Sequence, residues 1–482
     1  MTVTDPTRSP EDASVPAAVV IGGGLAGTTA ALRLADAGLR VTLLETRPRL
    51  GGLAFSFRRD SPAGELAVDN GQHVHLRCCS AYQWFLDRID GASLAPVQPR
   101  LDVPVLDAAT RRLGRLRRSN LPVPLHLARG LATYPHLSLA ERAAVSRAAL
   151  ALRKLDPADP QLDDVDFAGW LRAHGQSPRA VEALWDLVGL ATLNARAPDV
   201  SLALAAMVFR TGLLSEPSAA DIGVSRVPLG ELHDQLAGRA LEKAGVRTVL
   251  QARARRIVHR PHSGDWRVTV QQGRGPAEDL VAGTVVLAVA HHEAYRLLPD
   301  GALPDRGTLR RIGTSPILNV HVVYDRPVLR APFFATLGSE IQWVFDRTAQ
   351  SGLTGGGQYL TLSQSAARDV IDEPVAALRE RFLPELARLI PPARAADVRD
   401  FFVTRERSAT FAPAPGVGRL RPGARTGLPG LYLAGAWTDT GWPATMESAV
   451  RSGITAAGEA LTVLGRPHRD DPPHSLDRRA AA

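Results

Sequence analysis

The amino-acid sequence predicts an α/β protein in which a parallel-sheet domain is assembled from three separated segments, with a mixed α+β domain inserted in two pieces. Three observations predict this fold. Residues 17–45 have the pattern of a strand, a glycine-rich turn, a helix and a second strand. From about residue 91 the pattern becomes largely helical, and strand-and-helix patterns return near Pro228 and at residues 430–458. A chain of 482 residues is also too long for one hydrophobic core.

The changes in pattern also give the expected domain bounds. The first domain is expected in residues 17–90, 228–300 and 405–465, and the inserted domain in residues 91–227 and 301–404. The polar ends, residues 1–16 and 466–482, are expected to be disordered tails.

The first strand, helix and strand each have a local reason to form. Ala17–Ile21 is a short apolar run, and residues 25–37 are rich in Ala and Leu, which favour a helix. Gly38 ends that helix, and the apolar run Arg40–Leu44 leads directly to Glu45.

The turn between this strand and helix contains the spacing G-x-G-x-x-G. Gly22 permits a tight turn, Gly24 lets the backbone approach a pyrophosphate, and Gly27 lets helix and strand pack closely. The helix N-terminus, at Leu25 and Ala26, offers free N–H groups and positive potential to phosphates. A carboxylate about twenty residues later can bind ribose hydroxyls, so the motif and Glu45 predict a Rossmann-type dinucleotide site.

The later elements follow from the same kinds of pattern. A strand is expected at 64–75, with a turn at Asp69–Gly71, and then a helix at 81–89 with Ser80 as its N-cap. Further helices are expected at 137–155, 167–191, 232–244 and 373–390, and further strands at 246–257, 266–271, 285–289, 315–324 and 358–363. Residues 430–458 have the pattern of a strand, a glycine-rich turn and a closing helix.

Composition excludes several classes of protein. Hydrophobic residues at 45% and charged residues at 22% are typical of a globular protein and exclude a disordered chain or a fibre. No secretory signal or run of about eighteen apolar residues occurs, so we expect a cytoplasmic protein. The adjacent Cys78 and Cys79 are poorly placed for a disulfide, and no metal-ligand spacing occurs.

The net charge of +8 has two explanations that the sequence leaves open: an anionic partner, or a genome that favours arginine codons. We find no nucleic-acid recognition motif and expect no nucleic-acid partner. Five arginines crowd into residues 111–118, and the apolar segment 121–127 follows them. This arrangement predicts either a solvated basic loop or docking on an anionic membrane surface, at the inner face of the cell membrane.

Beyond the glycine motif, the chain resembles the FAD-dependent amine oxidase and phytoene desaturase superfamily, and more closely the hydroxysqualene dehydroxylase family. The resemblance spans about residues 17–465. It is carried by Leu50-Gly51-Gly52-Leu53-Ala54-Phe55-Ser56 with Asp69-Asn70-Gly71-Gln72-His73-Val74, by residues 315–321 with 325–328, by residues 405–411, and by residues 431–447, which contain Thr440-Gly441-Trp442-Pro443-Ala444-Thr445-Met446-Glu447.

The resemblance implies a flavoenzyme that removes the hydroxyl of hydroxysqualene to give squalene, in hopanoid or triterpenoid biosynthesis. It implies a hydrophobic isoprenoid substrate, an external reductant for the flavin, and FAD. That FAD should be non-covalent, because no cysteine follows Cys79. The residues expected to hold FAD are Gly22, Gly24, Leu25, Ala26, Gly27, Glu45, Thr46, Arg47, Gly51, Gly52, Gly435, Thr445 and Met446.

Two positions depart from the family pattern. Leu53 stands where the family usually has arginine, and Ala436 stands where it usually has an acid that bonds the ribityl chain. Each departure removes a polar contact worth roughly 1 kcal/mol, which predicts weaker FAD binding than in relatives.

Removal of a hydroxyl as water requires a general acid. The candidates are Asp69, His73, His321 and Glu447. His73 is the preferred candidate, because histidine titrates near neutrality, although a hydrogen bond that holds its turn is the more ordinary role.

Other activities stay open. A phytoene or carotenoid desaturase would share the fold and most motifs, and a non-catalytic isoprenoid carrier would share the fold. An amine oxidase is disfavoured, because that family typically uses a lysine beside the flavin and no lysine follows Lys243.

Overall fold

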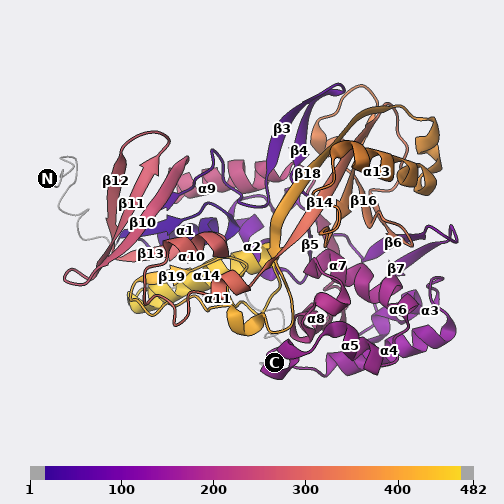
Figure 1. Ribbon diagram of the computed structural model, residues 1–482, viewed down its shortest axis with the longest axis horizontal. Coiled ribbons are helices and arrows are strands. Elements are labelled where there is room, and N and C mark those ends of the chain that lie inside the picture. The colour runs from indigo at the N-terminus through magenta and orange to yellow at the C-terminus, as the bar shows by residue number, and fades with distance from the viewer. Residues whose placement is uncertain (1–16, 468–482) are drawn as a thin grey trace.

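The computed structural model describes residues 17–467. The expected tail at 1–16 lies outside these residues, as does the tail at 466–482 beyond its first two positions. Figure 1 shows a parallel sheet with flanking helices in one half of the molecule, and a larger sheet with a group of helices in the other. Within residues 17–467, none of the helices is both long and apolar enough to cross a lipid bilayer.

The first half contains a five-stranded parallel sheet whose strands come from three separated parts of the chain. The order is β19-β13-β1-β2-β9, and every neighbouring pair is parallel. The bounds are β1 Ala17–Ile21, β2 Arg40–Leu44, β9 Arg247–Val249, β13 Thr284–Leu287 and β19 Leu431–Leu433. Four of these strands are continuous apolar runs or nearly so, as expected where both faces of a parallel sheet are covered.

Both faces of this sheet are covered. Ala18 and Val20 pack with the helices α1 and α14, whereas Val19 and Ile21 pack with a three-stranded antiparallel sheet. A Cβ on Gly453 of α14 would lie 2.2 Å from the carbonyl oxygen of Ala26, so the two helices touch backbone to backbone. The bounds are α1 Leu25–Asp36, α2 Ser80–Arg88, α9 Ala237–Lys243, α10 His291–Leu297, α14 Met446–Val463, β10 Ala252–Arg260, β11 Asp265–Gln272 and β12 Ala277–Ala282.

The second half is built on a seven-stranded sheet in the order β18-β14-β17-β16-β15-β6-β7, in which only β15 and β6 are parallel. Helix α13 (Val375–Leu389) packs on it through Leu378, Phe382 and Leu386. The strand bounds are β6 Asp102–Asp107, β7 Leu113–Arg117, β14 Thr314–Tyr324, β15 Phe333–Leu337, β16 Trp343–Asp346, β17 Gln358–Gln364 and β18 Val398–Phe411.

A group of helices lies beside the β7 end of this sheet (Figure 1). Their bounds are α3 Ala128–Ala132, α4 Leu139–Arg153, α5 Phe167–Ala173, α6 Pro178–Ala180, α7 Leu187–Leu193 and α8 Leu202–Phe209, with wider turns at Val181–Asp186 and Arg210–Leu214. Two small antiparallel pairs complete the strands, β3 Ser56–Ser61 with β4 Gly64–Asp69 and β5 Val74–Leu76 with β8 Ile222–Val224. The short helix α11 Thr308–Arg311 lies against α10, and the short helix α12 Thr348–Ser351 lies against β4 and β17.

Two elements differ from the sequence-based expectation. The helix expected at 167–191 is broken, because Gly175 takes a φ of +70° after α5 and the Ser177 side chain then caps a new helix that begins at Pro178. The strand expected at 246–257 is two strands in different sheets, separated at Gln251, which has a φ of +54°. The domain bounds stay predictions; β18 runs without a break across the bound predicted between residues 404 and 405.

Candidate functional site

The glycine motif lies where β1 meets α1, at the carboxyl edge of the parallel sheet. Gly22 has a φ of +111°, and a Cβ there would lie 2.3 Å from the carbonyl oxygen of Ala288, which follows β13. A Cβ on Gly27 would lie 1.8 Å from the Gly22 carbonyl oxygen. In the order β19-β13-β1-β2-β9, the connections from β1 and β13 lead away in opposite directions, and ligands bind at such a switch point.

Glu45 holds this loop from the end of β2. Its Oε2 accepts a hydrogen bond of 2.7 Å from the Gly23 N–H, and its Oε1 accepts from the N–H of Arg47 at 2.7 Å and from the Thr46 hydroxyl at 3.1 Å. The carboxylate is thus fixed beside the glycine loop, with Thr46 and Arg47 exposed next to it.

The Gly51–Gly52 turn lies directly against the glycine loop. The Gly51 N–H donates to the Gly23 carbonyl at 2.9 Å, and a Cβ on Gly52 would lie 2.9 Å from Gly24 Cα. The structure therefore brings together three of the sequence-predicted groups: the glycine loop, residues 45–47 and residues 51–52. A backbone cradle of this kind, with a helix N-terminus at Leu25, fits the pyrophosphate and ribose of a dinucleotide.

Arg49 braces the same turn, a role that the sequence did not indicate. Its Nη1 donates to the carbonyls of Leu50 at 3.0 Å and Gly52 at 3.2 Å, and its guanidinium lies over the Phe55 ring, 3.4 Å from the centroid. Leu53, at the position of the usual family arginine, leaves half of its surface exposed.

Asn70 connects this cofactor-side turn to the seven-stranded sheet. Its side chain accepts from the Phe55 N–H at 3.1 Å and donates to the Leu53 carbonyl at 3.0 Å and to Glu406 at 2.9 Å. Its carbonyl accepts from Asn319 of β14 at 3.1 Å and from Thr404 of β18 at 2.8 Å. The segment that begins at Asp69 therefore lies between the predicted cofactor residues and the second sheet.

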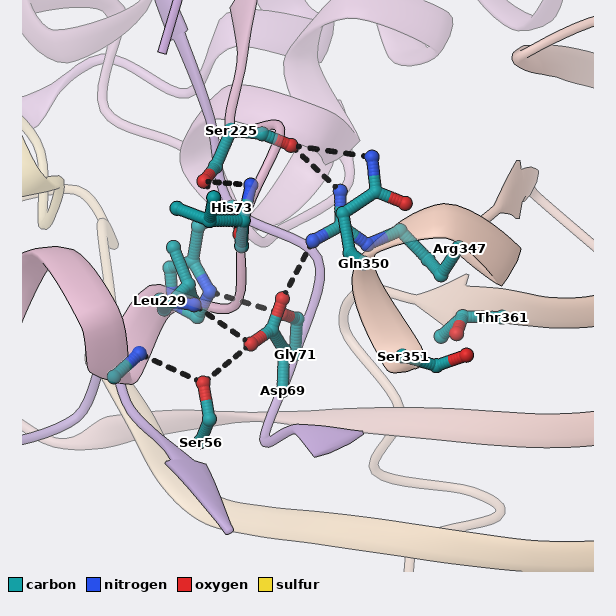
Figure 2. Close-up of polar contacts among 12 residues, drawn as sticks. Ser56, Asp69, Gly71, His73, Ser225, Leu229, Arg347, Gln350, Ser351 and Thr361 are labelled. Atoms are coloured by element: carbon teal, nitrogen blue, oxygen red, sulfur yellow. Dashed lines mark hydrogen bonds and ion pairs between the residues drawn. The ribbon is translucent and has the colours of Figure 1, made fainter. Parts of the chain in front are cut away.

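The Asp69 carboxylate is committed to the protein. Oδ2 accepts from Arg347 Nη2 at 2.8 Å, and Oδ1 accepts from the Ser56 hydroxyl at 2.6 Å and from the Leu229 N–H at 2.9 Å (Figure 2). Both Asp69 and Arg347 are buried. Three donors on one carboxylate favour a structural role for Asp69 over proton transfer.

His73 lies four residues after Asp69, and one of its ring nitrogens has no hydrogen-bond partner among residues 17–467. Nδ1 lies 3.1 Å from the Gly71 carbonyl, and since a carbonyl only accepts, Nδ1 carries the proton (Figure 2). No residue within 17–467 contacts Nε2 by a hydrogen bond. Burial lowers the pKa of His73, against the Gly71 hydrogen bond and the charges of Asp69 and Glu406, which raise it.

His321 is a fully buried histidine with both nitrogens in use. Nδ1 lies 2.7 Å from the Tyr359 hydroxyl and Nε2 3.0 Å from the Thr404 hydroxyl, and the ring stacks on Phe402. Burial lowers the pKa of His321 to about 3, so the ring is neutral near pH 7. These contacts favour a place in the core of the second sheet rather than the role of a proton donor.

Glu447 connects two helices. Its Oε1 accepts from the Ala81 N–H at 3.1 Å and from Arg451 Nε at 2.6 Å, and its Oε2 accepts from the Tyr82 N–H at 2.7 Å. The carboxylate therefore satisfies the N-terminal N–H groups of α2 from the first turn of α14. Burial raises the pKa of Glu447, and the charge of Arg451 and the two backbone hydrogen bonds lower it.

The C-terminal turn between β19 and α14 completes the edge of the site. Gly435 has a φ of +139°, and a Cβ there would lie 2.5 Å from Nε1 of Trp437, so only glycine fits. Thr445 caps α14, its hydroxyl accepting from the Ser448 N–H at 3.1 Å, and Met446 is the first residue of the helix. Positive potential at this helix N-terminus can face an electron-rich ring.

Arg421 holds this turn in place, and sequence reasoning missed it. Its guanidinium donates to the carbonyls of Trp437 at 3.3 Å, Thr438 at 2.5 Å and Trp442 at 2.9 Å, and lies over the ring of Phe411. Burial lowers its pKa to about 10, so it stays cationic at neutral pH. Its partners lie 16 to 21 residues away, and a buried arginine has no local sequence signal.

Comparisons with known proteins agree with this geometry. The profile of the family described as flavin containing amine oxidoreductase matches residues 25–461. The hydroxysqualene dehydroxylase of Rhodopseudomonas palustris is 31% identical, with 92% of this chain and 97% of that protein covered. That of Sinorhizobium fredii is 29% identical, with 92% and 98% covered. The zeta-carotene desaturase of Synechocystis sp. is 22% identical, with 93% and 97% covered.

Solved structures share the fold. A putative protoporphyrinogen oxidase from Exiguobacterium sp. 255-15 has a TM-score of 0.65 at 20% identity, covering 93% of this chain and 99% of that one. Wild-type putrescine oxidase bound to putrescine has a TM-score of 0.66 at 19% identity, covering 94% and 99%. The predicted α/β fold with a Rossmann-type domain is confirmed, and so is the predicted FAD cofactor.

Proposed function

This chain belongs to the flavin-containing amine oxidoreductase family, and from that premise we propose that it removes the hydroxyl of hydroxysqualene to give squalene. The observation that carries the proposal is the match to hydroxysqualene dehydroxylases, which extends over 92% of this chain and 97% of the R. palustris protein. A match of that length includes both the parallel-sheet half and the seven-stranded sheet.

The reaction replaces a C–OH bond with a C–H bond. It consumes one proton and one hydride and releases one water, and the allylic carbon stabilises the positive charge left when water departs. Reduced FAD, when bound, supplies the hydride. Two electrons are used per turnover, so an external reductant is required. The residues that would hold FAD are those of the glycine loop, Glu45, Gly51–Gly52 and the turn that Arg421 supports.

We assign the proton transfer to His73. Among the four candidates it alone has a ring or carboxyl atom without a partner within residues 17–467, because Asp69, His321 and Glu447 use all of theirs. Nδ1–H is tied to the Gly71 carbonyl, so the transferable proton is the one on Nε2. Because burial lowers the pKa of His73, the protonated imidazole is populated only at pH values below the ordinary histidine pKa of about 6.5. We therefore expect kcat to rise as the pH is lowered below about 6.5.

The test is an anaerobic reaction of the reduced, FAD-loaded protein with hydroxysqualene, in which flavin absorbance is followed and the lipid is extracted. Flavin reoxidation together with squalene supports the proposal; flavin that stays reduced with unchanged substrate rejects it. His73→Ala should abolish squalene formation and retain FAD, whereas a His73→Ala protein with full turnover removes His73 as the acid.

A carotenoid desaturase is the second candidate, favoured by the likeness to the zeta-carotene desaturase of Synechocystis sp., at 22% identity, and to the protein named probable zeta-carotene desaturase of Synechococcus elongatus, at 23%. It would run the flavin in the oxidative direction. Oxidised protein that is bleached by a polyene precursor, and reduced protein that ignores hydroxysqualene, would establish this candidate in place of the first.

We also propose that the protein takes its substrate from an anionic membrane surface. Leu121 and Leu125 are exposed by 50% and 53%, in a stretch that contains no acidic residue between Asp107 and Glu141. The arginine cluster offers less positive charge to a membrane than its five residues indicate. Arg115 and Arg117 pair with Asp102, and Arg118 pairs with the buried Asp221. The other exposed cations of residues 108–140 are Arg111, Arg112 and Arg129.

Vesicle sedimentation tests this docking. Leu121→Ser with Leu125→Ser should weaken binding to phosphatidylglycerol vesicles at least tenfold, because each buried leucine contributes about 1.5 kcal/mol or more. The control is Val281→Ser, another exposed apolar residue, on β12. In Figure 1, β12 lies at the left end of the molecule, whereas α3, which follows residues 121–127, lies at the right. Equal binding by both variants would reject this surface.

A further inference from the structure

Arg347 is a buried arginine at the junction between β16 and α12, with 4% of its surface exposed. Its two terminal nitrogens bind different segments: Nη2 lies 2.8 Å from Asp69 Oδ2, and Nη1 lies 3.0 Å from the Ser225 carbonyl oxygen. Its own N–H donates to the Tyr359 carbonyl at 2.8 Å. Figure 2 shows the guanidinium between Asp69 and Ser225. The residue therefore belongs to the second sheet but contacts two segments outside it.

These two segments hold the two ends of one turn. Asp69 is the last residue of β4, and residues 70–73 follow it. The turn then enters β5, whose first residue Val74 pairs with Val224 of β8, and Ser225 comes directly after Val224. One guanidinium thus holds the start of the turn through the Asp69 side chain and its end through the β5–β8 pair.

The turn between these ends carries Asn70 and His73. Asn70 contacts both the cofactor-side residues Leu53 and Phe55 and the second sheet, and His73 presents the ring nitrogen Nε2. A displacement of either end by 1 Å would move His73 by a similar amount, which is enough to disturb a reaction that needs aligned groups.

We propose that Arg347 is a positioning residue, which fixes residues 70–73, and with them His73, relative to the seven-stranded sheet. The ion pair with Asp69 fixes the start of the turn, and the hydrogen bond to the Ser225 carbonyl fixes its end. The assignment rests on the proposed function for its effect on catalysis, whereas its effect on the turn stands apart from any substrate.

Three variants of the FAD-loaded protein test this role. Arg347→Met removes both interactions. Arg347→Lys keeps a cation for Asp69, but a single ammonium group cannot bind both partners as the planar guanidinium does. Arg59→Met is the matched control. Arg59 pairs with Asp400 at 3.4 Å. This ion pair also joins the β3–β4 hairpin to the second sheet, but through residues outside the turn 70–73. Each variant is examined by hydrogen exchange of the backbone, by FAD affinity and by steady-state kinetics.

For Arg347→Met we expect exchange at residues 69–76 and 222–230 to rise at least tenfold, kcat to fall at least tenfold, and KM and FAD affinity to stay within threefold. Arg347→Lys should recover part of kcat, and it carries the test if Arg347→Met does not fold. Arg59→Met should leave both the exchange of these residues and kcat within twofold of the wild type.

The outcomes separate this inference from the proposed function. If hydrogen exchange rises in the turn of the Arg347 variants but the wild-type protein fails to act on hydroxysqualene, the positioning role is supported and hydroxysqualene is rejected as the substrate. If the wild-type protein is active and the Arg347 variants keep the hydrogen exchange and the kcat of the wild type, the positioning role is overturned. A uniform loss, equal in the Arg347 and Arg59 variants, also overturns it, because it would reflect stability alone.

Discussion

Arg421 is a single residue on which the C-terminal turn depends. It places a cation among the backbone carbonyls of residues 436–442, and it forms no ion pair with a carboxylate of residues 17–467. Arg421→Met should leave several carbonyls unsatisfied, at about 1–3 kcal/mol each, and so loosen the turn. We expect the Kd for FAD to rise at least tenfold, measured by the return of flavin fluorescence on dilution.

The matched control for this change is Arg425→Met, four residues further on. Arg425 pairs with Glu459 at the surface, and its side chain is more than half exposed. Its loss should change the Kd for FAD by less than twofold, since exposed ion pairs contribute under about 1 kcal/mol. An equal loss of FAD by both variants would contradict the role of Arg421.

The residues of the cofactor loop could be read from the sequence because their cause is local. Gly22, Gly24 and Gly27 lie within six positions, and Glu45 follows the next strand. Arg347 and Arg421 could not be found in this way. Arg347 meets Asp69 across 278 positions, and the contact depends on how the two halves pack. A buried ion pair of this kind leaves no periodic or spaced pattern in the sequence.

At the scale of elements, the contact between α14 and α2 is the one that a single substitution can break. Glu447 binds the N-terminal N–H groups of α2 and the Arg451 side chain, in a buried position. Glu447→Gln keeps the shape but removes the buried negative charge that pairs with Arg451, and it replaces one acceptor of the α2 N–H groups by an amide that donates. We therefore expect a loss of about 3 kcal/mol in the free energy of unfolding. Urea denaturation of the FAD-loaded protein measures it.

Glu459→Gln is the control on the same helix. Glu459 pairs with the exposed Arg425, so its change should cost under about 1 kcal/mol. If Glu447→Gln instead abolished turnover with unchanged stability, Glu447 would be acting as an acid and its assignment as a connection between helices would be wrong.

Elements were predicted well where the pattern is strong and local, whereas several strands of the seven-stranded sheet were not expected, namely β6, β7, β15, β16 and β18. The apolar runs of β1, β2 and β13 and the glycine-flanked β19 were all expected. Strand β7 was not, because Leu-Gly-Arg-Leu-Arg has few apolar residues and a glycine. Its position at the edge of the sheet explains this composition, since charged residues on an edge strand prevent pairing with another chain.

At the scale of the whole molecule, the chain folds around histidines that stay neutral. Burial lowers the pKa of His75, His233 and His291 to about 4 and that of His321 to about 3. In the unfolded chain these residues take up protons below about pH 6.5. Their contribution to stability is therefore fully present above pH 6.5 and is lost as the pH falls toward their folded-state values.

His321→Gln isolates one such group. Between pH 6 and pH 4.5 the unfolded wild type binds one more proton at His321 than the folded protein, which corresponds to about 1.4 kcal/mol of unfolding free energy per pH unit. The variant has no histidine at this position to bind that proton. As the pH is lowered, its free energy of unfolding should therefore fall by about 1.4 kcal/mol per pH unit less than that of the wild type. Glu447, whose pKa burial raises, acts in the opposite direction but equally in both proteins. Urea unfolding at several pH values measures the two slopes. Equal slopes would mean that His321 binds its proton in the folded protein as readily as in the unfolded chain, and that the core around Tyr359 and Thr404 admits a charge.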